Sequence, residues 1–184
     1  MQFSEILGQE HIKSHLTKSA DLGRIPHAQL FVGPEGSGTL PMAIAYAQYI
    51  LCSNANSENR GQNESCNIKF DKLSHPDLHF VYPTVATEDV KTKPKSIDFI
   101  GDWRNFVSHN PYGSLFDLYT VLGVNNKQGE IRVDDAQEIL KSLDYVVYRV
   151  DEEKGKLRPL DNIGLFESMD ETNYVFVPNN KMSV

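Results

Sequence analysis

Apolar residues recur every three or four positions in several stretches of the chain, which is the spacing of an amphipathic helix. The pattern is densest between residues 42 and 51, where few side chains are polar, so we expect a helix covered on most sides. Asp134 fits the N-cap of a later helix, with Gln137 as its capping-box partner. The predicted helices are 3–21 (one helix or two short ones), 39–52, 97–107, 115–121 and 134 to about 143, with a weaker pattern over 160–169.

Short apolar runs between the helices predict β-strands. The run at 28–32 is typical of a strand in the middle of a sheet whose two faces are both covered. Because strands alternate with helices, the sequence predicts an α/β fold with a parallel sheet. Residues 53–65, rich in Asn, Ser, Glu and Gly, predict a surface loop or a partly disordered segment. The predicted strands are 28–32, 78–82, 145–150 and 173–177, and residues 130–133 form a short strand or an extended lead-in.

Composition places the chain among ordinary globular proteins. Its 184 residues suffice for one medium domain with a core, and 40% of them are hydrophobic and 23% charged. The formal net charge of −7 argues against a general nucleic-acid-binding protein, which would be basic. The sequence contains no apolar run long enough to span a membrane and no signal-peptide pattern at its N-terminus. We therefore expect a cytoplasmic protein without a membrane partner.

A glycine-rich loop joins the strand at 28–32 to the buried helix. Gly33 and Gly38 occupy the two glycine positions of the phosphate-binding pattern G-x-x-x-x-G-K-[ST]. The next two positions should carry a lysine and then a serine or threonine, but they carry Thr39 and Leu40. In such a loop the lysine supplies positive charge to the outer phosphates and the hydroxyl holds magnesium. The backbone pattern of a phosphate site is therefore present without its two functional side chains.

The chain offers no replacement for the missing lysine, because no lysine lies between Lys18 and Lys69. Losing one member of a buried charge pair costs on the order of 2–5 kcal/mol, which is roughly a thirty-fold to several-thousand-fold loss of affinity. We predict no ATP hydrolysis, no tightly bound ATP and no cofactor. A tight turn without a ligand is the favoured interpretation, and weak anion or nucleotide binding by the backbone is the alternative. This vestigial phosphate loop consists of Gly33, Gly36, Gly38 and Thr39.

Two groups of short motifs stand out along the chain. The first group comprises Gly8-Gln9, 23–28, 30–38 and 75–78; the second comprises Trp103-Arg104, 110–117 and 126–128. The first group resembles motifs of bacterial clamp-loader subunits, the AAA+ proteins of DNA polymerase III. The second group looks like the delta-prime subunit of Bacteroidetes-type bacteria. The resemblance covers about residues 3 to 143 and is specific as a combination.

The resemblance implies a P-loop NTPase fold of the AAA+/RecA-like type, a three-layer sandwich with a mostly parallel central sheet. Residues 1–143 would form the clamp-loader-like N-terminal region, and 144–184 a divergent completion of that domain or a replaced tail. We find no arginine-finger motif, helical lid or collar domain of the family in this sequence. An excised domain, a truncated product and a divergent relative remain three alternatives.

Within that family, the missing lysine places the chain with the delta-prime stator, a non-catalytic part of the machine that loads the sliding clamp. Its implied partners are the motor subunits and the delta subunit, with primed DNA and the sliding clamp reached indirectly through the complex. One alternative is an ATP-binding motor subunit of the same family. A second alternative is a small zinc-binding interaction module.

The family commonly carries a four-cysteine zinc module after the P-loop helix, and only Cys52 and Cys66 match it here. Two thiolates do not complete a tetrahedral zinc site. His75 and His79 are poor replacements, since four residues of extended chain span about 13 Å. We expect no metal, with Cys52 as a core thiol and Cys66 as an ordinary loop or helix cysteine.

Residues 145–152 have the outline of a Walker B strand, in which an apolar run ends on carboxylates that hold magnesium or polarise water. Arg149 interrupts the run. Residues 151–155 are also a plausible charged turn, and we favour that interpretation. Residues 175–180 vaguely resemble the strand and polar tip that sense nucleotide in the family.

Overall fold

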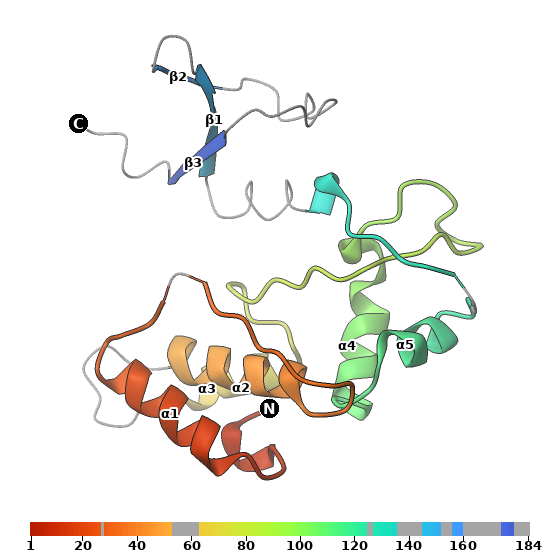
Figure 1. Ribbon diagram of the computed structural model, residues 1–184. Coiled ribbons are helices and arrows are strands. Elements are labelled where there is room, and N and C mark those ends of the chain that lie inside the picture. The colour runs from red at the N-terminus through yellow and green to blue at the C-terminus, as the bar shows by residue number, and fades with distance from the viewer. Residues whose placement is uncertain are drawn as a thin grey trace.

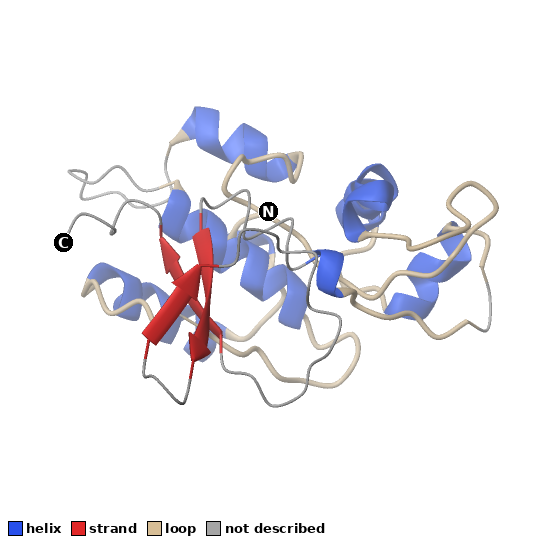
Figure 2. Ribbon diagram, turned by 90° about the horizontal axis from the view of Figure 1, so that it is seen from above, coloured by secondary structure: helices blue, strands red, loops and turns tan. Residues whose placement is uncertain are grey.

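The described part of the chain is helical up to residue 135 and forms strands beyond it (Figures 1 and 2). The computed structural model describes residues 1–26, 28–52, 63–124, 127–135, 145–151, 156–159 and 174–178. The 3₁₀-helices are η1 (Phe3–Glu5) and η2 (Ser96–Phe99). The α-helices are α1 (Glu10–Asp21), α2 (Thr39–Leu51), α3 (Glu64–Asp71), α4 (Ile100–His109) and α5 (Leu115–Val121), and the strands are β1 (Tyr145–Asp151), β2 (Lys156–Pro159) and β3 (Tyr174–Pro178).

The helices predicted from apolar spacing are confirmed at η1 with α1, at α2, at η2 with α4, and at α5. The sequence did not predict α3, which is short and mostly polar. Only two of its side chains, Cys66 and Phe70, are buried, and they lie one turn apart. The side chain of Asn63 caps this helix by accepting a hydrogen bond from the Cys66 N–H at 3.1 Å. Its apolar residues, Cys66, Ile68 and Phe70, alternate at a spacing of two, which is not the periodicity of a helix.

The first two predicted strands are wrong as sheet elements. Residues 28–32 and 78–82 belong to no strand, and the described residues before 135 contain one isolated β-bridge, between Thr84 and Glu130. Leu30 and Val32 are 87% and 81% exposed, because no described strand lies beside them. The central sheet of a three-layer sandwich is therefore not seen in the described residues.

Two predicted strands are confirmed, at β1 and β3, but the parallel order is wrong for them. All three described strands form one sheet in the order β2-β1-β3, and both pairings are antiparallel (Figure 2). The register places Asp151 opposite Lys156. Residues 152–155, which make up most of the predicted charged turn, lie outside the described residues, so the choice between that turn and a Walker B strand stays a prediction. The nucleotide-sensing resemblance falls partly on β3, and the weaker helical pattern at 160–169 lies outside the described residues.

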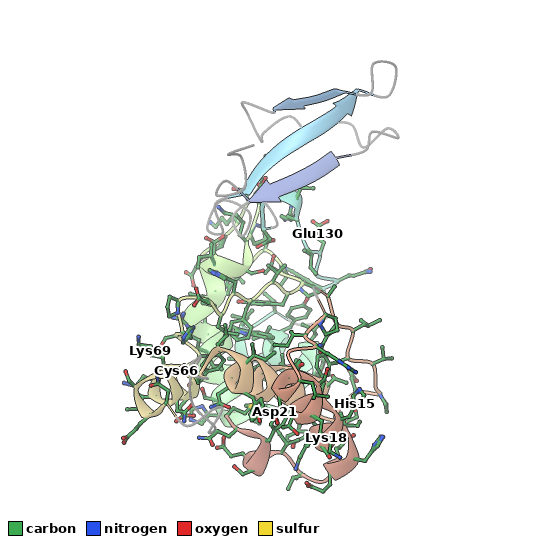
Figure 3. All side chains as sticks on the ribbon, turned by 90° about the vertical axis from the view of Figure 1, so that its left-hand side faces the viewer. His15, Lys18, Asp21, Cys66, Lys69 and Glu130 are labelled. Atoms are coloured by element: carbon green, nitrogen blue, oxygen red, sulfur yellow. A yellow bond between two sulfur atoms is a disulfide. The ribbon has the colours of Figure 1, made fainter. Side chains whose placement is uncertain are left out.

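Helix α2 lies between two groups of buried side chains, which confirms the prediction that it is covered on most sides. Met42 and Ala45 pack with Leu16 and Ala20 of α1, whereas Ile44 belongs to a cluster with α3, α4 and α5. The Tyr49 hydroxyl of α2 also donates to Asp21 of α1 at 2.8 Å; Asp21 is labelled in Figure 3. The cluster that contains Ile44 also includes the fully buried side chains of Phe70, Leu73, Val107 and Leu118.

A buried carboxylate connects residues 127–135 to the body of the protein. Asp135 is 3% exposed, and it accepts hydrogen bonds from the backbone N–H of Ser96 at 2.6 Å and of Arg132 at 3.2 Å. The last described helical turn begins at residue 133, so Asp134 lies within it and the predicted N-cap is wrong. Gln137 and the rest of the predicted helix lie outside the described residues, as do residues 53–62 of the predicted loop.

None of the described helices combines the length and apolar composition needed to cross a membrane.

Candidate functional site

The glycine-rich loop enters α2 in the conformation that its glycines allow. Gly36 and Gly38 have φ angles of +75° and +88°, in the left-handed region that residues with a Cβ rarely adopt. Gly38 is the N-cap of α2, and no side chain caps this helix end. The loop is therefore a turn fixed by backbone geometry, as the motif predicts.

Side chains fill the space beside the first glycine of the motif. A Cβ on Gly33 would lie only 2.4 Å from Ser37 Oγ and 3.0 Å from Thr39 Cγ2. The Ser37 hydroxyl is buried and has no hydrogen-bond partner among the described residues. The Ser37 backbone is held on both sides, since its N–H donates to Pro34 O at 3.1 Å and its carbonyl accepts from Gln9 Nε2 at 3.0 Å.

Tyr112 holds the second glycine from outside the loop. A Cβ on Gly38 would lie 2.8 Å from Tyr112 Cε1, so the ring is packed directly against the glycine. The Tyr112 hydroxyl accepts a hydrogen bond from the Leu7 N–H at 3.0 Å, which connects the loop to the N-terminal segment. From the sequence, residues 110–113 were predicted only to form a turn and to belong to a family motif. The contact of Tyr112 with Gly38 joins residues 74 positions apart, so the local sequence gives no signal of it.

Two cavities flank the loop, and neither offers a positive charge to a phosphate. The larger, of about 500 Å³, lies between α1, residues 29–34 and the start of α2; the smaller, of about 270 Å³, lies between the loop and residues 111–115. Among the described residues, no lysine or arginine lines either cavity, and Glu35, in the smaller one, is charged. A bound phosphate would therefore meet a carboxylate and no cation in the described walls.

The first turn of α2 is also poorer in donors than a phosphate site requires. Anions bind at helix N-termini through free backbone N–H groups and the positive end of the helix dipole. Thr39 and Leu40 have N–H groups there, but Pro41, the third helical residue, has none. Proline is compatible with the first turn of a helix, and at this position beside the loop Pro41 also removes a backbone donor.

The two cysteines form a disulfide, so their expected assignment as unpaired thiols is wrong. Cys52 ends α2, Cys66 lies in the first turns of α3, and their Cα atoms are 5.4 Å apart. The described residues contain no group of three or more His, Cys, Asp or Glu side chains arranged to hold a metal ion. His75 instead packs against the ring of Phe70, with centroids 5.0 Å apart, and its Nδ1 accepts the Asp77 N–H at 3.2 Å.

The glycine loop opens a buried helix, as a P-loop does, but no described strand precedes it. The particular family follows from comparison with known proteins. The family model described as "DNA polymerase III, delta subunit" matches residues 8–148, and the chain belongs to this family. The predicted resemblance to clamp-loader subunits of DNA replication is thereby confirmed.

Curated relatives match shorter parts of the chain. It is 42% identical over 65 residues to DNA polymerase III subunit gamma/tau of Mycobacterium tuberculosis (35% of this chain, 11% of the relative). It is 32% identical over 75 residues to subunit delta' of Bacillus subtilis (41% and 22%). It is 31% identical over 100 residues to subunit gamma of Buchnera aphidicola (53% and 27%). The matches thus span 11% to 27% of the lengths of these relatives, and no solved structure matches the chain.

Proposed function

We propose that this chain is a non-catalytic, delta-prime-like stator subunit of the DNA polymerase III clamp loader, acting in the cytoplasm. The observation that carries this proposal is the combination found at the start of α2. The loop keeps its left-handed glycines, while Thr39, Leu40 and Pro41 replace the lysine, the metal-ligating hydroxyl and a backbone donor. A turn with this shape and without this chemistry supports a role in architecture. The chain then works through protein surfaces and has no ATPase activity of its own.

The missing lysine disfavours both the binding and the hydrolysis of ATP. Without it, the charge of the outer phosphates and the charge that develops during transfer are both uncompensated. The described residues of the flanking cavities supply no other cation, and Glu35 adds repulsion. The vestigial phosphate loop, made of Gly33, Gly36, Gly38 and Thr39, therefore remains a fold element under this proposal.

Isothermal titration of the purified chain with ATP and Mg²⁺ tests the proposal. We expect no magnesium-dependent binding at micromolar ATP. The matched variant carries Thr39→Lys and Leu40→Thr, which restore the charge and the hydroxyl. Because loss of a charge partner weakens binding roughly thirty-fold or more, we expect this variant to bind ATP more tightly than the natural chain by that factor. Micromolar, magnesium-dependent binding by the natural chain would contradict a vestigial loop.

A second experiment tests the partners. The proposed partners are the motor subunits and the delta subunit, and primed DNA and the sliding clamp are reached through the assembled complex. The net charge of −7 agrees with this indirect route to DNA. We expect co-elution of the chain with purified motor subunits in size-exclusion chromatography. Failure of the chain to associate with any clamp-loader subunit would contradict the assignment, whatever the ATP titration shows.

The second candidate is an ATP-binding motor subunit of the same family. It is favoured by one observation, the 42% identity over 65 residues to a gamma/tau subunit. The ATP titration separates the two candidates, because a motor subunit has to bind ATP with magnesium before it can hydrolyse it. Under the stator proposal, residues 1–143 form the clamp-loader-like region and 144–184 complete or replace the end of that domain.

A further inference from the structure

Helix α3 buries few of its side chains in the described part of the protein. Of its eight residues, only Cys66 and Phe70 are buried, at 8% and 0% exposure. Besides these two side chains, a hydrogen bond from Gln48 to Asn67 joins α2 to α3. A short helix with two buried side chains has little packing energy, since apolar burial is the main source of helix stability in proteins.

The attachments of α3 differ between its two ends. At the C-terminal end, Phe70 is fully buried, Asp71 accepts from the Met1 ammonium at 2.6 Å, and the Leu73 carbonyl accepts from Arg104 Nε at 2.8 Å. At the N-terminal end, the Cys52–Cys66 disulfide is the covalent side-chain link to α2, and the Gln48–Asn67 hydrogen bond lies beside it. The disulfide therefore controls mainly the N-terminal half of α3; Cys66 and Lys69 of this helix are labelled in Figure 3.

We propose that Cys52 and Cys66 form a reversible thiol–disulfide switch that fixes or releases α3. In the reduced form each cysteine carries one S–H hydrogen. Oxidation forms the S–S bond, and the two electrons and two protons that leave the pair reduce a low-molecular-weight disulfide, such as oxidised glutathione, to two thiols. In the described residues no third ligand stands near enough to make a metal site of the pair, so the switch has two protein states, disulfide and dithiol.

The location of the cysteines determines what the switch does. Cys52 is 1% exposed and packs in the same cluster as Ile44 and Phe70, so exchange with a soluble thiol requires local opening of α3. Cutting the bond removes a constraint on a closed stretch of chain about fifteen residues long, for which loop-closure entropy predicts a loss of stability of roughly a hundredfold in the unfolding equilibrium. The loss falls first on α3, because α4 and α5 do not carry the bond. The switch does not depend on the stator role, since it concerns the isolated chain.

The test uses the purified full chain, equilibrated with oxidised glutathione or with a reductant. Free thiols are counted by alkylation after denaturation and mass spectrometry; we expect none in the oxidised sample and two in the reduced one. Amide hydrogen exchange is then measured along α3 and α4. We expect exchange in residues 64–71 to rise about tenfold to a hundredfold on reduction, while residues 100–109 change little.

The Cys52→Ala/Cys66→Ala variant is the matched control. It should show the fast α3 exchange in both buffers, which separates the effect of the bond from that of the reductant. The reduced natural chain is also analysed for zinc. Two thiols that persist in excess oxidised glutathione, equal α3 exchange in both states, or stoichiometric zinc in the reduced protein would each overturn the switch. None of these outcomes bears on ATP binding, so they leave the proposed stator role to its own test.

Discussion

Single residues at the glycine loop decide between a ligand site and a structural turn. Gly36 and Gly38 provide backbone angles that other residues rarely adopt, and Gly33 lies where Ser37 Oγ leaves no room for a side chain. These positions specify the shape of the loop. Thr39 and Leu40 specify its chemistry, which is that of a neutral turn. The conformation of the loop and its side-chain chemistry therefore depend on different residues, and this protein has the conformation without the chemistry.

Replacing Gly38 with alanine should destabilise the protein by about 1–3 kcal/mol. The alanine would have to adopt a φ angle of +88°, and its Cβ would lie 2.8 Å from Tyr112 Cε1. Urea unfolding followed by circular dichroism measures the change. Gly101→Ala is the matched control, because Gly101 lies in α4 with no heavy atom within 4 Å of the new Cβ, and should be neutral or stabilising by about 0.5–1 kcal/mol. Equal stabilities for the two variants would contradict the packed loop.

Individual helices show how local side-chain bonding sets the boundaries of elements. The start of α5 is a capping box, in which the Ser114 side chain accepts from the Asp117 N–H at 3.3 Å. The Asp117 carboxylate in turn accepts from the N–H and the hydroxyl of Ser114, at 2.8 Å and 3.0 Å. The hydrogen bond from the Ser114 backbone, and then that from its side chain, lowers the pKa of Asp117. The ionised carboxylate is therefore the form that stabilises this helix start.

This capping box predicts a pH-dependent contribution to stability. The pKa of Asp117 is lower in the folded than in the unfolded protein, so its contribution is fully present above the unfolded value, about 4, and disappears as the pH falls through the folded value. We expect Asp117→Asn to lower the free energy of unfolding at neutral pH, and the difference from the natural chain to shrink below about pH 4. Ser114→Ala should lose about 1 kcal/mol at pH 7. Urea titrations at pH 7 and pH 3 make the comparison; parallel pH profiles for the natural chain and Asp117→Asn would contradict it.

Across the whole molecule, the helical body and the sheet are built from different parts of the chain. Helices α1 to α3 lie together and α4 packs with α5, whereas the strands come from residues beyond 145 (Figure 1). The extended segment 28–32 precedes the glycine loop but pairs with no described strand. Phe31 faces α2, with its ring centroid 6.4 Å from that of Tyr46, while Leu30 and Val32 face away and are exposed.

Leu30→Lys tests this arrangement directly. Because Leu30 is 87% exposed, we expect the free energy of unfolding to change by less than about 0.5 kcal/mol. Ile44→Ala is the comparison in the core, where the side chain is 2% exposed and truncation should cost about 2–5 kcal/mol. Chemical unfolding of both variants measures the two effects. A loss of several kcal/mol for Leu30→Lys would instead place this segment inside a covered sheet, as the sequence predicts.

Prediction from sequence succeeded where the signal is local and failed where it depends on distant partners. Apolar spacing located α1, α2 and α4, each of which buries three or more side chains at helical spacing, and α5, in which Leu118 and Tyr119 are buried. The division of the chain at residue 143 stays a prediction. Helix α3 was missed because its apolar residues alternate at a spacing of two, and strand direction depends on which segments meet in space. The packing of Tyr112 on Gly38 joins positions far apart in the chain and has no local signal.

The sequence by itself determined that the glycine loop carries neither the lysine nor the hydroxyl of its motif, because both are matters of residue identity. The structure added that no lysine or arginine lines the described walls of the flanking cavities. It also determined the family, through motifs spread over much of the chain. Only the tertiary structure decided that Cys52 and Cys66 are joined, that Tyr112 packs on Gly38, and that Leu30 and Val32 lie exposed. These properties depend on which surfaces come together, and that is set by long-range packing.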